Sequence, residues 1–239
     1  MDSNKWQAVF IRRQNHEKTT MKVRNTTIII LLSALTSAYA ESLQPVPHST
    51  PMTVPDNMQV PLPHAKLLSR LEQAYPMYTK DSILIISGST QLLTLYYKGK
   101  LIDQYPISTG VKGMGNKSGS GKTPLGAHRI SHRYGKNAQI GTIFKARRNT
   151  GKIAKIITQP ISIKTDDVTT RIMWLDGLEK GVNKGGKVDS HRRYIYIHGT
   201  PEEGLIGRPA SHGCIRMLNT DVIKVFKQTA INSLVYIIN

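Results

Sequence analysis

Cys214 is the only cysteine of the chain and lies in the segment SHGCIR at residues 211–216. A thiol close to histidines can perform nucleophilic catalysis, because a thiolate attacks acyl groups and an imidazole can take the thiol proton. The alternative is that Cys214 is a small buried hydrophobic residue, which is the commoner role of a lone cysteine. Gly213 favours catalysis, since a residue without a side chain lets a substrate approach the thiol closely.

His198 is the second candidate, 16 positions before Cys214 at the end of a strand-like run, YIYI, at 194–197. If His198 ends one strand and Cys214 begins the next, the connection between them folds the imidazole towards the thiol, and His198 acts as a general base. The alternative makes His198 a hydrogen-bonded core residue and His212 a turn residue. The connection contains four turn-forming residues: Pro201, Gly204, Gly207 and Pro209.

The segment GNKSGSGKT at 115–123 resembles a nucleotide-binding P-loop only at its end. That motif requires a glycine five positions before Gly121, where this chain has Asn116. Pro124 also opposes the helix that normally follows the motif. We therefore interpret the segment as a loop that leads into KTPLG at 122–126 and the next strand.

The N-terminal region has the pattern of an export signal. Residues 21–24 are basic, residues 28–32 are apolar, and AYA at 38–40 fits a small-x-small cleavage site, so 21–40 is predicted to be a signal peptide. Polar residues 1–20 do not belong to such a signal, and we expect translation to start at Met21. The alternatives are a long basic region before the apolar run, or a membrane anchor that is never cut. Export predicts a location in the periplasm or the cell wall, peripheral to the membrane at most.

The chain carries a formal charge of +18, from 33 lysines and arginines against 15 acids. Cleavage after residue 40 removes six cationic and two acidic residues and leaves +14. Such a charge indicates a polyanionic partner, although part of it can serve solubility alone. Export argues against nucleic acid, which leaves wall polymers and phospholipid head groups. A single cysteine excludes an internal disulfide framework and a cysteine-rich zinc site.

The rest of the chain predicts a proline-rich linker with a short helix at 41–80, followed by a catalytic domain at 81–239. Short β-like runs separated by turn residues indicate a mainly β sandwich or barrel with one or two short helices. One helix is expected near 64–75 and another at 219–229, with Asn219 or Thr220 as its N-cap. Strands are expected at 82–86, 91–97, 101–108, 126–131, 156–163, 193–198 and 233–238.

Taken together, IHGT at 197–200, SHGCIR at 211–216 and KTPLG at 122–126 resemble the signature of the L,D-transpeptidase (YkuD-type) catalytic domain family. The resemblance extends over roughly 81–239. It implies a β-rich cysteine enzyme of the periplasm or cell wall that needs no cofactor and acts on peptidoglycan peptide stems. Residues 171–193 carry no element of the signature and are interpreted as an insertion that shapes the substrate groove.

The resemblance also implies how the acyl chemistry is divided among residues. Cys214 would attack the carbonyl at the L-centre of the third residue of a tetrapeptide stem, usually diaminopimelate, and release D-alanine, leaving a thioester that an amine acceptor resolves. His198 would be the general base, and the Gly199 carbonyl would orient its imidazole. These roles agree with the chemistry of covalent catalysis, in which one difficult acyl exchange is split into two easier steps.

The remaining positions of the signature are implied to complete the pocket. Ser211 and His212 would support it, and backbone N–H groups near Gly213 and Cys214 would form the oxyanion hole. Arg216 would hold a substrate carboxylate, for which the guanidinium fork is well suited.

Several functions remain open at this stage. The acceptor can be another stem, giving a 3→3 cross-link, a lysine of a wall-anchored lipoprotein, or water, giving an L,D-carboxypeptidase. A basic wall-binding module without catalysis is an alternative from a different class. A cytoplasmic nucleic-acid-binding protein is a third, but the chain has no recognisable nucleic-acid motif.

Overall fold

The computed structural model describes residues 64–78, 82–163 and 165–239. Within them the chain forms two α-helices and ten strands, which confirms the mainly β prediction. The predicted extension at 1–20, the signal peptide at 21–40 and the linker residues 41–63 lie outside the described residues. In order, the elements are α1 (Ala65–Ala74), β1 (Ser82–Ser87), β2 (Leu92–Tyr97), β3 (Lys100–Ser108), β4 (Gly126–Tyr134), β5 (Thr142–Lys145), β6 (Arg148–Ile153), β7 (Val168–Gly177), β8 (Tyr196–Gly199), β9 (Ile215–Met217), α2 (Asn219–Gln228) and β10 (Leu234–Ile238).

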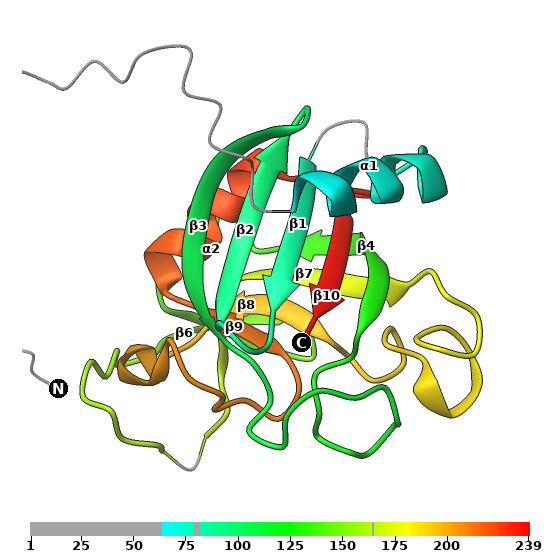
Figure 1. Cartoon of the computed structure of the whole chain (residues 1–239). Coiled ribbons are helices and arrows are strands. Elements are labelled where there is room, and N and C mark those ends of the chain that lie inside the picture. The colour runs from blue at the N-terminus through cyan, green and yellow to red at the C-terminus, as the bar shows by residue number, and fades with distance from the viewer. Residues whose placement is uncertain (1–63, 79–81, 164) are drawn as a thin grey trace, which may run out of the picture. The chain divides into compact units, whose positions relative to one another are not determined.

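The strands form one sheet that closes on itself. Its order is β4-β10-β1-β2-β3-β9-β8-β7-β5-β6. The first and the eighth strand in this order, β4 and β7, also pair with each other, so the strands between them close into a barrel. The β5–β6 hairpin extends the sheet beyond β7. Two pairs are parallel, β1 with β10 and β8 with β9, and all other pairs are antiparallel. Figure 1 shows the front strands with α1 across the upper part of the barrel and α2 behind β2 and β3.

The main core fills the barrel interior because alternate residues of each strand point inward. β8 contributes Ile197, β9 contributes Ile215 and Met217, and β7 contributes Met173 and Leu175, all of them fully buried. α2 packs its apolar face, Val222, Val225 and Phe226, into the same core. A second cluster forms where Leu68 and Leu71 of α1 cover the outer face of β1 and β10.

A third hydrophobic cluster lies on the outer face of the barrel wall. Phe144 of β5, Ile172 and Trp174 of β7, and Tyr196 of β8 are buried together there, and Cys214 packs against them. The cluster brings the β5–β6 hairpin and β7 next to the residues that the sequence marks as catalytic.

Two sequence predictions about the strands are wrong. Residues 156–163 form no strand; they belong to a connection between β6 and β7, and the strands of this region are β5 and β6. Residues 171–177 are not part of an insertion, because they lie in β7, which pairs with β4, β5 and β8. The apolar run at 156–163 was misleading because β propensity alone does not make a strand: none of these residues is buried, and they have no strand partner.

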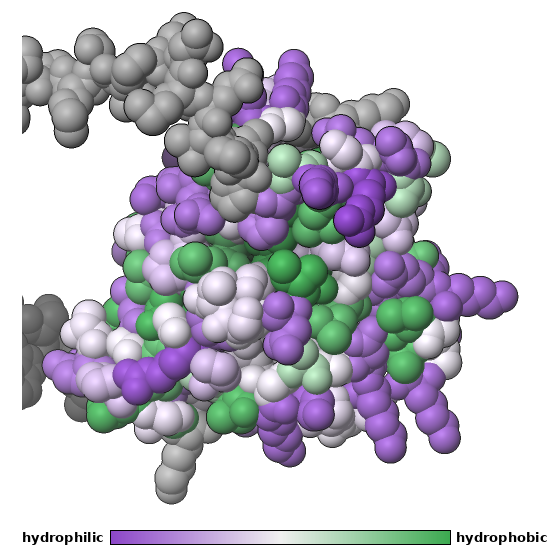
Figure 2. Space-filling model, in the orientation of Figure 1, coloured by the Kyte–Doolittle hydropathy of each residue, from purple (hydrophilic) through white to green (hydrophobic). Residues whose placement is uncertain are grey.

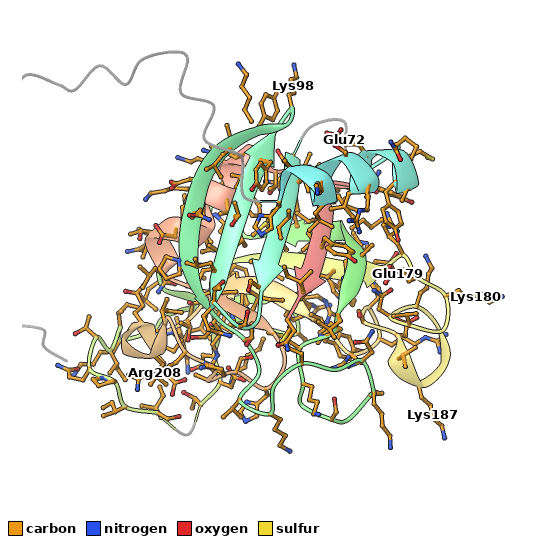
Figure 3. The ribbon with its side chains drawn as sticks, viewed as in Figure 1. Glu72, Lys98, Glu179, Lys180, Lys187 and Arg208 are labelled. Carbon is orange, nitrogen blue, oxygen red and sulfur yellow. The ribbon has the colours of Figure 1, made fainter. Side chains whose placement is uncertain are left out.

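Figure 2 shows long hydrophilic side chains that project beyond the barrel. Figure 3 identifies Lys180 and Lys187, in the connection between β7 and β8, and Lys98, at the β2–β3 turn, among the outward-pointing side chains. No helix within 64–78, 82–163 and 165–239 has the length and apolarity needed to cross a bilayer.

We expect Ile197→Ala to destabilise the barrel, because Ile197 of β8 is 0% exposed and is paired with the buried Ile215 of β9. Truncating such a side chain lowers the free energy of unfolding by about 2–5 kcal/mol and the Tm by roughly 5–20 °C. Thermal unfolding followed by circular dichroism measures the change. Ile140→Ala is the matched control, since Ile140 is exposed and its truncation should cost less than about 0.5 kcal/mol. Equal shifts in the two variants would contradict this account of the core.

Candidate active site

The parallel pairing of β8 with β9 positions the candidate site. Ile197 is opposite Ile215 and His198 is opposite Arg216. Since Ile197 and Ile215 point into the core, His198 and Arg216 lie on the outer face, and so does Cys214, one residue before β9. The structure therefore brings the predicted histidine and cysteine to the same face of neighbouring strands.

Cys214 is a free, half-buried thiol held by backbone groups. The N–H of Tyr196 donates to Sγ at 3.4 Å, and the thiol donates to the carbonyl of Tyr194, also at 3.4 Å. Burial raises the pKa of Cys214 to about 12. The resting side chain is therefore a neutral thiol.

His198 is buried, with 1% of its surface exposed. Its Nδ1 lies 2.7 Å from the Gly199 carbonyl oxygen. Because a carbonyl only accepts, Nδ1 carries the proton, and Nε2 is left as the basic nitrogen. Burial lowers the pKa of His198 to about 4, so the ring is neutral at physiological pH. Among the hydrogen bonds of the described residues, none joins this ring to the Cys214 thiol, which is bonded to Tyr194 instead.

Position 199 requires glycine, because a side chain there would collide with neighbouring atoms. A Cβ at this position would lie 2.4 Å from Oδ1 of Asn219 and 3.0 Å from the carbonyl oxygen of Thr169. Asn219 binds the end of β8 through its Nδ2, which donates to the Thr200 carbonyl at 2.7 Å. The prediction that Asn219 or Thr220 is the N-cap of α2 is wrong, since the N-cap is Leu218 without a side-chain cap. Asn219 instead connects α2 to β7 and β8, accepting from Thr169 Oγ1 at 2.7 Å.

The turn before Cys214 is held by Ser211. Its Oγ accepts the Gly213 N–H at 3.0 Å and donates to the Cys214 carbonyl at 2.6 Å. Gly213 has φ 121°, a conformation that residues with side chains rarely adopt, and an added Cβ would lie 3.0 Å from the Lys122 carbonyl oxygen. The Gly213 N–H, predicted for the oxyanion hole, is thus engaged within the turn.

The loop that resembles a P-loop forms one side of the site. Thr123 is buried, and its Oγ1 accepts the Gly110 N–H at 2.8 Å and donates to the Gly213 carbonyl at 3.0 Å. The Arg193 guanidinium donates to the carbonyls of Asn116, at 2.8 Å, and Lys122. Beside this loop is a pocket of about 360 Å³. It is lined by Ser118, Gly119, Gly121, Arg192, Arg193, Tyr194, Ile195 and His212.

Arg216 is buried and paired with two carboxylates of this chain. Nη1 donates to Glu202 at 2.6 Å and Nη2 donates to Asp166. The other oxygen of Asp166 lies 2.6 Å from Nδ1 of the exposed His212. Burial acts to raise the pKa of Asp166, but Arg216, His198 and His212 outweigh it, and the pKa is lowered. Both Nη groups of Arg216 are therefore occupied, and its predicted role with a substrate carboxylate stays a prediction.

Sequence reasoning missed Asp166 and Glu202. Glu202 also accepts from Ser162 Oγ at 3.0 Å, so the pair ties the β6–β7 connection to β9. The only available signal was the position of Arg216 on a strand that must be buried, because a buried arginine needs carboxylates nearby. That signal does not say which acids they are.

An aromatic group next to Cys214 was also missed. Trp174 stacks on His191 with ring centroids 3.8 Å apart, and the guanidinium of Arg147 lies 4.6 Å from the centre of the Trp174 ring. Arg147 also donates to the Tyr196 hydroxyl at 3.1 Å. No group of three or more metal-ligating side chains is found in the part of the chain that the structure describes.

Comparison with known proteins connects this geometry to a family. The model of the YkuD family, described as the L,D-transpeptidase catalytic domain, matches residues 81–237. No curated protein is a match for the sequence.

Solved structures of L,D-transpeptidases are similar at low identity. The protein from Mycobacterium smegmatis is 15% identical, with 66% of this chain and 59% of that one covered and a TM-score of 0.40. Residues 123–326 of the Xylanimonas cellulosilytica protein are 15% identical, with 72% and 69% covered and a TM-score of 0.42. L,D-transpeptidase 3 from Mycobacterium tuberculosis, in complex with a faropenem-derived adduct, is 15% identical, with 66% and 60% covered and a TM-score of 0.41.

The match spans less than two thirds of the M. smegmatis and M. tuberculosis chains. The family match, in contrast, covers well over half of this chain and includes Thr123, His198 and Cys214. The chain therefore belongs to the family of YkuD L,D-transpeptidase catalytic domains.

Proposed function

We propose that this chain is a peptidoglycan L,D-transpeptidase with Cys214 as its nucleophile and His198 as its general base. One observation carries the proposal: the register of β8 and β9 pairs His198 with Arg216 and leaves Cys214, two positions before Arg216, on the same outer face. Family membership supports this class of reaction and supports peptidoglycan peptide stems as the substrate.

In the first step, His198 takes the thiol proton while Sγ attacks the carbonyl carbon at the L-centre of a tetrapeptide stem. The bond from this carbon to the nitrogen of the terminal D-alanine breaks, and His198 returns the proton to the leaving amine. The products are a thioester and free D-alanine. In the second step an acceptor amine attacks the thioester, and the proton it loses restores the thiol.

The electrostatics favour a neutral resting pair over a thiolate–imidazolium pair. Burial disfavours charge on both groups, raising the pKa of Cys214 to about 12 and lowering the pKa of His198 to about 4. Proton transfer would then accompany attack on the bound substrate, after the thiol leaves the Tyr194 carbonyl. The hydrogen bond from Nδ1 to Gly199 keeps Nε2 available as the acceptor.

The other predicted residues have supporting roles in this proposal. Ser211 would shape the turn, and Gly213 and Cys214 would supply backbone N–H groups to the oxyanion. For Gly213 this requires its N–H to exchange the Ser211 hydroxyl for the substrate oxygen. Arg216 and His212 would hold Asp166, and with it the β6–β7 connection, against the site.

The acceptor and the location belong to the proposal as well. A second stem would give a 3→3 cross-link, a lysine of a wall-anchored lipoprotein would give anchoring, and water would give carboxypeptidase activity. Export through the predicted signal at 21–40 would bring the enzyme to the periplasm or cell wall. The charge of +14 that remains after cleavage supports contact with an anionic polymer there.

We expect Cys214→Ala to abolish release of D-alanine from a purified tetrapeptide muropeptide, because no other thiol exists to form the thioester. Mass spectrometry of the reaction measures D-alanine and the remaining muropeptide. The fold should survive, since the change removes a single sulfur atom, and the circular dichroism spectrum is the control. Turnover by the variant would refute the assignment of the nucleophile.

The wild-type products in the same experiment identify the acceptor. A cross-linked dimer indicates transpeptidation, and a tripeptide monomer indicates hydrolysis. A folded wild-type protein that releases no D-alanine would favour the wall-binding module.

The raised pKa of Cys214 predicts a distinctive pH dependence of alkylation. Only the thiolate reacts, so the rate with iodoacetamide should rise about tenfold per pH unit from pH 6 to pH 9, without a plateau. Intact-mass spectrometry gives the rate at the single cysteine. The Cys214→Ala protein should take up no label. A plateau near neutral pH would show a preformed thiolate and contradict the neutral pair.

A further inference from the structure

Arg147 occupies an unusual backbone position beside the candidate site. It is the second residue of the two-residue turn between β5 and β6, and both turn residues have positive φ, 46° at Ala146 and 67° at Arg147. Such turns strongly prefer Asn-Gly or Asp-Gly, because residues with larger side chains are strained there. Strain of this kind is concentrated at functional sites, where surrounding contacts hold it.

The contacts of Arg147 fix its guanidinium over the aromatic group. The guanidinium carbon lies 4.6 Å from the centre of the Trp174 ring and 5.4 Å from that of Tyr194, and Nη1 donates to the Tyr196 hydroxyl at 3.1 Å. The hydrogen bond to Tyr196 is the main cause that raises the pKa of Arg147, so the group is always charged. Stacking occupies a face of the guanidinium and leaves other N–H groups at its edge.

Arg147 is a cation without a carboxylate partner in the described part of the chain. No ion pair of these residues includes it, whereas Arg129 is paired with Asp176 and Arg216 with Asp166 and Glu202. A preorganised guanidinium with free N–H groups is suited to binding a planar carboxylate.

Two tyrosines connect Arg147 to the nucleophile. Tyr196 donates its backbone N–H to the thiol of Cys214 and receives the Arg147 hydrogen bond at its hydroxyl. The Tyr194 carbonyl accepts from the same thiol, and the Tyr194 ring lies beside the guanidinium. Tyr194 also has a positive φ of 56°, a second strained residue in the same group.

We propose that Arg147, rather than Arg216, binds a free carboxylate of the donor peptide stem next to the carbonyl that Cys214 attacks. This rests on the proposed function for the identity of the ligand. Two carboxylates of the stem have the required chemistry: the side-chain carboxylate at the third residue and the terminal carboxylate of D-alanine. Arg147 is a specificity-determining residue that selects stems carrying that charge.

The test compares three donor stems: one with both carboxylates free, one amidated at the third-residue side chain and one amidated at the terminal D-alanine. We expect Arg147→Gln to lower kcat/KM for the free stem by about 10- to 100-fold, the value of a charge-assisted hydrogen bond. For the stem in which the bound carboxylate is amidated, kcat/KM of the variant should be close to that of the wild-type protein. The stem that shows this behaviour identifies which of the two carboxylates Arg147 binds. Arg147→Lys should retain part of the preference.

Arg148→Gln is the matched control, since Arg148 is the exposed neighbour at the start of β6. This variant should leave kcat/KM unchanged for all three stems. If Arg147 only stabilised the hairpin, Arg147→Gln would lower kcat/KM equally for the three stems. That result, or no loss on the free stem, would overturn the proposal.

Binding measured without turnover separates this proposal from the proposed function. Isothermal titration of the same stems into Cys214→Ala protein, with and without Arg147→Gln, should show the same preference in Kd. If the wild-type protein releases no D-alanine but this preference is found, the transferase function fails and the carboxylate site stands. Equal Kd values for free and amidated stems in the Cys214→Ala protein would overturn the site.

Discussion

The parallel pairing of β8 with β9 is the constraint on which the site depends. Once Ile197 and Ile215 are buried side by side, the two-residue period of the strands directs His198, Cys214 and Arg216 to the outer face. A shift of one residue would move the whole set into the core. The hydrophobic core of the barrel therefore positions the chemistry, although none of the catalytic candidates belongs to it.

The outer face of β8 and β9 carries both a compensated ion-pair cluster around Arg216 and a neutral pair, His198 and Cys214. Arg216 is compensated by Glu202 and Asp166, as a buried guanidinium must be, because an unpaired buried charge costs about 3–5 kcal/mol. His198 is buried and Cys214 half-buried, and both stay neutral, since burial lowers the pKa of His198 and raises the pKa of Cys214. The ion pairs hold the β6–β7 connection in place, while the neutral pair remains free to exchange a proton with a substrate.

Positive φ angles occur at many turns of the described residues, and three of these positions lie around the thiol. Gly213, Tyr194 and Arg147 all have positive φ, and for the two residues with side chains this costs about 1–2 kcal/mol each. The Ser211 hydrogen bonds stabilise the first of these positions, and the stacking of Trp174, His191 and Arg147 stabilises the others. The aromatic group thus supports the geometry of the site.

The sequence by itself determined what depends on local pattern. Short β-like runs and turn residues predicted a β barrel or sandwich, most of its strands and α2, and the spacing of His198 and Cys214 predicted that they lie at neighbouring strands. Contacts between distant residues were decided only by the tertiary structure. Asp166 lies 50 positions from Arg216, and Arg147 lies 49 from Tyr196, so no periodicity connects them. For the same reason Asn219 appeared to be a helix cap, although it binds β7 and β8, and 171–177 appeared to be an insertion, although it is a strand of the barrel wall. Local pattern specifies which face a side chain takes, and only the closed sheet specifies which partner it finds there.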